Sequence, residues 1–185
     1  MSFAALLARF VEILGVAEVP FMVAGSFAST HHGTPRTTQD LDLVIDPTFA
    51  SLDALLGALP ETAYYVSESA ARDALRRRSM FNVIDLATGW KIDLIVRKAR
   101  PFSVEEFGRR TPVKMLGVDV FVATAEDTIV AKLEWAKLSG GSERQLRDVR
   151  GILDAKGAAL DIAYIEKWVD DLEVRSPWED PALRA

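Results

Sequence analysis

The sequence predicts a mixed α/β (α+β) fold, in which a small mixed sheet flanked by helices is followed by a helical C-terminal portion. Short apolar runs alternate with segments of helical spacing as far as residue 123. From residue 124 onward the spacing is helical, and glycines stand where turns are expected. Strands mixed with helices, and then a run of helices, are typical of an α+β domain with a helical extension.

The helices are predicted from apolar residues three and four apart and from residues that start or stop a helix. They span residues 3–14, 26–32, 47–59, 69–78, a short stretch within 101–110, 125–138, 143–156 and 161–172. Pro47 is expected in the first turn of its helix, where a missing amide proton costs nothing. Thr124 is expected to cap the helix that follows it.

The strands are predicted from short apolar runs that lie between turn residues. They span residues 20–24, 41–45, 64–66, 80–86, 90–96, 113–116 and 118–122. We interpret Thr88-Gly89 as a hairpin turn, which places Ile84 opposite Asp93. On this register Asp85 and Asp93 project from opposite faces of the sheet, so they cannot both join one site there.

Composition excludes several classes of protein. The 185 residues include no cysteine, so disulfides and thiolate zinc sites are excluded. No apolar run approaches the roughly 20 residues of a membrane helix. Residues 1–17 lack the basic start of a signal peptide. We therefore expect a cytoplasmic protein that does not enter a membrane.

The net charge of −5 is unevenly distributed along the chain. Residues 72–114 carry 11 basic and 5 acidic side chains, whereas residues 1–71 carry 2 basic and 8 acidic ones. A basic band of this kind can bind the phosphates of a nucleotide or of RNA. A solvated helix face with charged loops is an equally weighted alternative.

The most informative acids are Asp40 and Asp42 in the run Asp-Leu-Asp-Leu-Val-Ile. Residues two apart in a strand point to the same face, so these two carboxylates are expected side by side. Holding like charges this close costs about 1–4 kcal/mol at surface-like dielectrics. A divalent cation would remove that cost. Asp46 shares the same parity, but it precedes Pro47 and is expected to cap a helix.

These residues resemble a known group. Val23-Ala24-Gly25-Ser26, then the segment from Arg36 to Leu43 with its Asp-x-Asp, and then Ile92-Asp93-Leu94 resemble the nucleotidyltransferase superfamily related to DNA polymerase β. The helical segment from Ala125 to Asp148 is similar to that of minimal bacterial members, including abortive-infection toxin enzymes. The resemblance covers roughly residues 20–156, and its Gly-Ser and Asp-x-Asp motifs are its specific part.

The resemblance implies a nucleotidyltransferase fold and a set of site residues. The implied catalytic residues and ligands of Mg²⁺ (or Mn²⁺) are Asp40, Asp42 and Asp93, and the implied nucleotide-binding residues are Gly25, Ser26, Arg36, Thr38 and Lys132. Gly25 would leave room for phosphates to approach the backbone, and the helix starting at Ser26 would favour anions. A loop role for Arg36 and Thr38, and a solvated Lys132, are equal alternatives. For Arg147-Asp148 an ion-paired helix face is slightly favoured, and for His31-His32 a surface role.

The implied activity is transfer of a nucleoside monophosphate from a nucleoside triphosphate (NTP) to a hydroxyl acceptor, with release of pyrophosphate. The acceptor could be RNA such as a tRNA end, a protein side chain or a small molecule. A toxin–antitoxin component acting through a cognate protein partner and a catalytically silent nucleotide-binding domain are the alternatives. We divide the chain into a catalytic domain (residues 1–123), a helical subdomain (124–175) and a loose tail (176–185).

Overall fold

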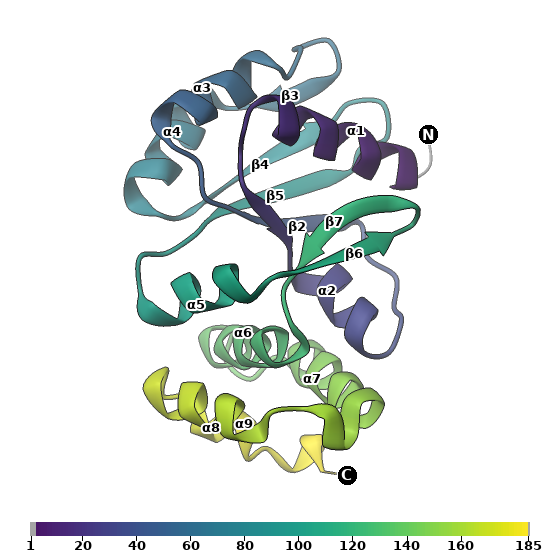
Figure 1. The fold of residues 1–185 in the computed structure, drawn as a ribbon, viewed down its shortest axis with the longest axis vertical. Coiled ribbons are helices and arrows are strands. Elements are labelled where there is room, and N and C mark those ends of the chain that lie inside the picture. Colours follow the sequence, from purple (N-terminus) through teal and green to yellow (C-terminus); the bar gives the residue numbers. More distant parts are fainter. Residues whose placement is uncertain (1–2, 185) are drawn as a thin grey trace. The chain divides into compact units, whose positions relative to one another are not determined.

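The computed structural model describes residues 3–184 and contains two compact units (Figure 1). The first unit comprises the described residues up to Val23 together with Gln39–Val122. The second unit comprises Ala24–Thr38 together with the described residues from Ala123 onward. The division into a catalytic domain, a helical subdomain and a tail stays a proposal. No helix in the described part of the chain is both long and apolar enough to cross a lipid bilayer.

The first unit is built on a mixed sheet of seven strands among the described residues, in the order β3-β4-β5-β2-β1-β7-β6. The strands are β1 (Phe21–Val23), β2 (Asp40–Ile45), β3 (Tyr64–Val66), β4 (Met80–Asp85), β5 (Lys91–Val96), β6 (Thr111–Met115) and β7 (Val118–Val122). The pairs β2–β5 and β1–β7 are parallel, and the other neighbouring strands are antiparallel. This arrangement, with its helices, confirms the predicted mixed α/β class.

The helices of the first unit are α1 (Phe3–Val16), α3 (Phe49–Gly57), α4 (Glu68–Arg77) and α5 (Pro101–Arg109). Among them, side-chain caps start α3 and α4, at Thr48 and Ser67. Thr48 caps α3 by accepting from the Ser51 amide, and the Ser51 hydroxyl accepts from the Thr48 amide in return. Pro47 therefore precedes the cap, and its predicted place in the first turn is wrong.

Asp46 is not a helix cap either, because Thr48 fills that role. Its carboxylate lies 2.8 Å from the Arg97 guanidinium and 3.8 Å from that of Arg78. Asp46 therefore ties the end of β2 to basic residues that follow β5 and α4 in the chain.

One face of the sheet is apolar and packs against α1. Leu41, Leu43 and Ile45 of β2 are fully buried, as are Ile92 and Leu94 of β5. From α1 the fully buried side chains are Leu6, Leu7, Phe10 and Leu14. The alternation along β2 and β5 leaves their remaining side chains on the opposite face.

The hairpin between β4 and β5 differs in register from the prediction. Asn82, not Ile84, lies opposite Asp93, because the Asp85 amide donates to the Trp90 carbonyl and closes a longer loop. The Asp85 carboxylate accepts hydrogen bonds from both the amide and the hydroxyl of Thr88 within that loop. The shift is two residues, which preserves parity. Asp85 and Asp93 therefore project from opposite faces, as predicted.

Helices form the second unit. They are α2 (Gly25–His32), α6 (Ala125–Leu138), α7 (Glu143–Lys156), η1 (Gly157–Ala159), α8 (Ile162–Asp171), α9 (Arg175–Trp178) and η2 (Pro181–Leu183). Thr124 caps α6 by accepting from the Asp127 amide, which confirms its predicted role. In the segment for which a loose tail was predicted, the side chains of Trp178 and Leu183 are buried.

Two glycines allow α2 and α7 to approach closely. A Cβ atom built at Gly33, which follows α2, would lie 2.7 Å from the backbone of Gly151 in α7. A Cβ atom at Gly151 would lie 2.9 Å from the Thr34 hydroxyl. The clash at Gly33 is with backbone, so the contact requires glycine there, whereas a side chain at Gly151 would force Thr34 to shift.

Asp85 is a buried charge of the first unit, and we expect it to stabilise that unit. It is fully buried and forms an ion pair with Arg9 of α1. We expect Asp85→Asn, which keeps the shape but removes the charge, to lower the free energy of unfolding by about 2–4 kcal/mol. Urea denaturation measures this loss. Asp53→Asn, which breaks the exposed pair with Arg72, is the control and should cost less than about 1 kcal/mol. Equal losses in the two variants would contradict the argument.

Candidate active site

Three of the predicted site residues lie on one face of the sheet in the first unit. Asp42 of β2 pairs directly with Asp93 of β5 in the parallel ladder, and Asp40 pairs with Lys91. Because paired residues on neighbouring strands share a face, and residues two apart do so as well, all four side chains project together. The ladder thus brings together the three acids predicted from the sequence, which we call the acid site.

Asp93 is the buried member of the acid site. The residue is 5% exposed, and its Oδ2 lies 2.9 Å from the Lys91 ammonium. Its other oxygen, Oδ1, is buried and has no hydrogen-bond partner. Asp40 is more open, with about half of its side chain exposed, and its Oδ1 lies 3.8 Å from the same ammonium.

Lys91 is a further member of the acid site, with no role predicted from the sequence. The hydrogen bond to Asp93 raises the pKa of Lys91 above its ordinary value, and the nearby carboxylates of Asp40 and Asp42 act in the same direction. The lysine is therefore an ammonium at neutral pH. Its spacing of two from Asp93 places it on the same face, and only the β2–β5 register brings it beside Asp40.

The acid site suits Mg²⁺ or Mn²⁺ by its chemistry. Among residues 3–184, no three His, Asp or Glu side chains stand in an arrangement that could hold a metal ion. Asp93 Oδ1 is a buried acceptor with no hydrogen-bond partner, which is unusual in a folded protein. Carboxylate oxygens are the ligands that Mg²⁺ and Mn²⁺ prefer. The three carboxylates therefore match a divalent cation in ligand type, and side-chain movement would be needed to bring them around one.

The second group of predicted residues lies in the second unit, around the start of α2. Gly25 has φ of +55°, in the left-handed region that favours glycine. Ala24 precedes the helix and supplies no side-chain cap to its first amides. Ser26 follows in the first turn, and its hydroxyl accepts a hydrogen bond from the Arg36 guanidinium. Gly25 and Ser26 thus form the first turn of α2, which begins one residue before the predicted start at Ser26.

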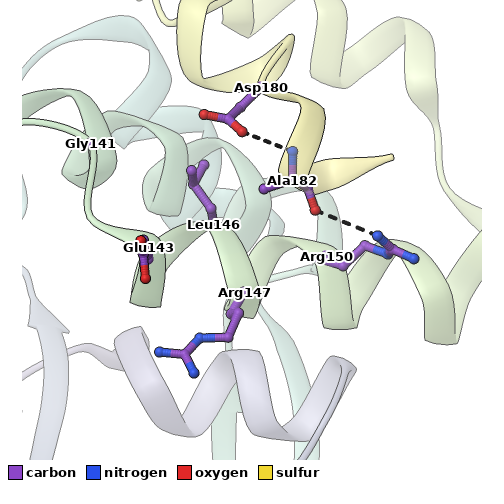
Figure 2. Close-up of a pocket in the computed structure, with 7 residues that line it drawn as sticks. All are labelled: Gly141, Glu143, Leu146, Arg147, Arg150, Asp180 and Ala182. Atoms are coloured by element: carbon purple, nitrogen blue, oxygen red, sulfur yellow. Dashed lines mark hydrogen bonds between the residues drawn. The ribbon is translucent and has the colours of Figure 1, made fainter. Parts of the chain in front are cut away.

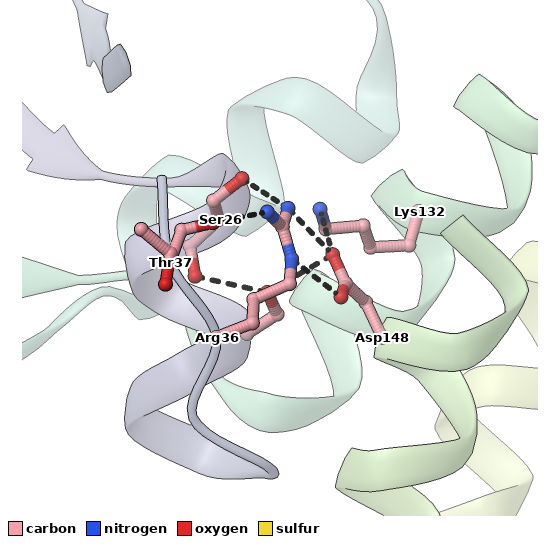
Figure 3. Close-up of polar contacts among 6 residues, drawn as sticks. Ser26, Arg36, Thr37, Lys132 and Asp148 are labelled. Carbon is pink, nitrogen blue, oxygen red and sulfur yellow. Dashed lines mark hydrogen bonds and ion pairs between the residues drawn. The ribbon is translucent and has the colours of Figure 1, made fainter. Parts of the chain in front are cut away.

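Arg36 and Lys132 converge on Asp148 (Figure 3). The guanidinium donates to both carboxylate oxygens, from Nε at 2.8 Å and from Nη2 at 3.1 Å. The Lys132 ammonium lies 2.7 Å from Asp148 Oδ2, and the Ser29 hydroxyl donates to the same oxygen at 3.3 Å. We call Ser26, Arg36, Lys132 and Asp148 the cation network.

Burial and ion pairing shift the pKa of Asp148 in opposite directions. Burial favours the neutral acid, but the hydrogen bonds from Arg36 and Lys132 hold the pKa of Asp148 below its ordinary value. Lys132 is buried, with 6% of its side chain exposed, so it is not a solvated lysine. The slight preference for an ion-paired role of Arg147-Asp148 holds for Asp148, whereas Arg147 is exposed.

Thr38 and the two adjacent histidines lie outside the cation network. Thr38 is half-buried in the loop that precedes β2. His31 is exposed, whereas His32 is buried and its Nε2 lies 2.7 Å from the Ala123 carbonyl oxygen. Burial lowers the pKa of both histidines, so the neutral imidazoles are favoured. The expected surface role therefore fits His31 but not His32.

A pocket of about 500 Å³ opens within the second unit (Figure 2). Its lining comes from the start of α7 and from the C-terminal segment, and consists of Gly141, Glu143, Leu146, Arg147, Arg150, Asp180 and Ala182. Arg150 is paired with Asp154, 2.8 Å away. None of the predicted site residues lines this pocket.

Comparison with known proteins yields structural relatives only. No protein-family model and no curated protein matches the chain. Among solved structures, the antibiotic-resistance factor ANT(2'')-Ia superposes with a TM-score of 0.61 at 13% identity, over 93% of this chain and 91% of the other. A crystal structure of ANT(2'')-Ia in complex with adenylyl-2''-tobramycin gives the same score and identity, over 97% of that chain.

Two further structures share the architecture. An antigenic nucleotidyltransferase-like protein from Paracoccidioides brasiliensis has a TM-score of 0.56 at 16% identity, over 98% of this chain and 92% of that one. The lincosamide antibiotic adenylyltransferase LnuA, bound to lincomycin, has a TM-score of 0.53 at 9% identity, over 82% and 96%. At these identities the likeness concerns the fold. The chain therefore has the nucleotidyltransferase fold, as the motifs predicted.

The cation network makes a stability prediction with a defined pH dependence. Asp148→Asn removes the carboxylate that pairs with buried Lys132, so we expect a loss of about 3–5 kcal/mol in unfolding free energy at pH 7. The pKa of Asp148 is lowered in the folded protein. Its stabilisation is therefore fully present above its unfolded pKa of about 3.9 and is lost as the pH falls through the lower folded value.

Urea denaturation of both proteins between about pH 7 and pH 2.5 tests this dependence. The gap between wild type and Asp148→Asn should be constant at neutral pH and should narrow on acidification. Asp154→Asn on the same helix, which breaks an exposed pair with Arg150, is the control and should cost less than about 1 kcal/mol. A gap that widens in acid would show that the Asp148 carboxylate does not stabilise the fold.

Proposed function

We propose that this chain is a Mg²⁺-dependent nucleotidyltransferase, with Mn²⁺ able to replace Mg²⁺. It moves a nucleoside monophosphate from an NTP to a hydroxyl acceptor. The observation that carries the proposal is the acid site. Asp40, Asp42 and Asp93 share one face of two paired parallel strands in a chain with the nucleotidyltransferase fold. A transferase activity fits the nucleotidyltransferases among its structural neighbours.

The reaction is a substitution at phosphorus. The acceptor hydroxyl oxygen bonds to the α-phosphorus of the NTP, and the bond from that phosphorus to the oxygen bridging to the β-phosphorus breaks. Pyrophosphate leaves with the electron pair, and the hydroxyl proton passes to solvent. Bound Mg²⁺ would neutralise triphosphate charge and lower the pKa of the acceptor hydroxyl.

The strands give the acid site the rigidity that such chemistry needs. Asp93 lies in the middle of β5, flanked by β2 and β4, so its backbone is fixed on both sides. Asp40 and Asp42 lie at the start of β2 and are half-buried, which leaves their oxygens open to a substrate. We assign this site to the proposed catalytic domain, residues 1–123.

The proposed nucleotide-binding residues are Gly25, Ser26, Arg36, Thr38 and Lys132. Guanidinium, ammonium and hydroxyl donors suit the oxygens of a phosphate as well as they suit a carboxylate. Asp148 keeps two of these donors, Arg36 and Lys132, together. We infer that Asp148 orders the cations that bind the triphosphate.

We infer the class of the acceptor from the charge of the chain and from the ligands of its structural neighbours. ANT(2'')-Ia in its complex carries adenylyl-2''-tobramycin, and LnuA binds lincomycin. In this chain, Arg76 and Arg77 are exposed at the end of α4, within the basic band. That band favours a phosphate-rich acceptor such as RNA over an antibiotic.

A labelling experiment tests the function and identifies the acceptor. The purified protein is incubated with NTPs labelled at the α-phosphate, Mg²⁺, total RNA and cell extract. Label should move into RNA, a protein or a small molecule, whereas label at the γ-phosphate should be recovered in pyrophosphate. Recovery of γ-label in the acceptor would mean phosphoryl transfer and would overturn the proposal.

The acids themselves supply the sharpest mutational test. We expect Asp40→Asn/Asp42→Asn to lower the transfer rate by at least about a hundredfold, because the ligands of the cation are lost. The melting temperature without metal should not fall, since a like-charge repulsion is relieved. Asp119→Asn, at an exposed position of β7, is the control and should retain activity. Unchanged transfer in the double variant would remove the metal-site proposal.

A further inference from the structure

Lys91 is placed at the acid site by the sheet itself. The parallel ladder sets it directly opposite Asp40, and the two-residue period of β5 sets it on the face of Asp93. Its ammonium lies 2.9 Å from Asp93 Oδ2 and 3.8 Å from Asp40 Oδ1. The lysine therefore pairs with two of the three carboxylates proposed to hold the cation.

Lys91 offsets part of the negative charge of the acid site. Three carboxylates and one ammonium leave a net charge of −2, which a single divalent cation would balance. Asp93 is buried, and an unpaired charge in such a position would cost several kcal/mol. Lys91 is the group that offsets this cost in the structure described.

The ammonium of Lys91 is paired, and the lysine side chain remains partly accessible. The Lys91 side chain is 40% exposed, whereas that of Asp93 is 8% exposed. A lysine stem has four rotatable methylene groups, so the ammonium can move into water without disturbing the strand. The carboxylate, by contrast, is fixed by β5 and cannot follow it.

We propose that Lys91 is the exchangeable counter-ion of the acid site. It neutralises Asp93 in the absence of a divalent cation, and it leaves Asp93 Oδ2 when the cation binds. This inference rests on the proposed function, because it assumes the metal site. Its consequence is that Lys91 weakens cation binding while it stabilises the metal-free fold.

Mn²⁺ binding, followed by electron paramagnetic resonance, tests the exchange directly. Lys91→Met and Lys91→Gln remove the competing charge, and each should bind Mn²⁺ about tenfold more tightly than wild type. Lys91→Arg keeps the charge and should not bind more tightly. Lys114→Met is the matched control, because Lys114 is also paired with an aspartate, Asp119 at 2.8 Å, on the exposed β6–β7 hairpin.

Thermal unfolding supplies a second readout that a passive surface lysine would not change. Without metal, Lys91→Met should melt at a lower temperature than wild type, because buried Asp93 loses its counter-charge. Saturating Mn²⁺ should raise its melting temperature by more than it raises that of wild type. Asp93→Asn in the Lys91→Met background should abolish both effects.

The outcomes separate the two proposals. Equal Mn²⁺ affinities in wild type and in both neutral variants would overturn the exchange and leave the metal site standing. Weaker binding in the neutral variants would also overturn it, because the lysine would then support the cation. Absence of Mn²⁺ binding in wild type and in every Lys91 variant would overturn both the metal site and the exchange.

Discussion

The parallel pairing of β2 with β5 is the constraint on which the first unit depends. With Asp42 opposite Asp93, one face of the two strands carries acids and a lysine, and the other carries fully buried Leu41, Leu43, Ile92 and Leu94. A slip of one residue would bury the acids and expose the leucines. The apolar face packed against α1 therefore fixes the register, and the register in turn assembles the acid site.

The second unit organises charge differently, around a single carboxylate. Asp148 of α7 gathers Arg36 from the loop after α2 and Lys132 from α6, so segments distant in sequence share one acceptor. In the first unit a lysine offsets crowded acids, and in the second an acid offsets crowded cations. In each case a buried charge is compensated within its own unit, which is the condition for keeping it.

Local periodicity and its limits explain which features could be predicted from sequence. The shared face of Asp40 and Asp42 follows from the two-residue period of a strand. The predicted register of the β4–β5 hairpin is wrong by two residues, but a shift of two leaves Asp85 and Asp93 on opposite faces, as predicted. The partnership of Lys91 with Asp40 depends on a ladder between strands far apart in the chain, which no local pattern contains. Pro47 was misplaced because Thr48 and Ser51 cap each other, a reciprocal bond that outweighs the preference of proline for a first turn.

The interrupted path of the chain has a consequence for biosynthesis. The second unit is assembled from Ala24–Thr38 and from the segment that begins at Ala123, and all of β2 to β7 lies between them. On the ribosome, α2 therefore emerges long before α6 and α7, the helices that it contacts. The contacts of α2 with α6 and α7 can therefore form only after translation has passed α7, so the second unit is completed last.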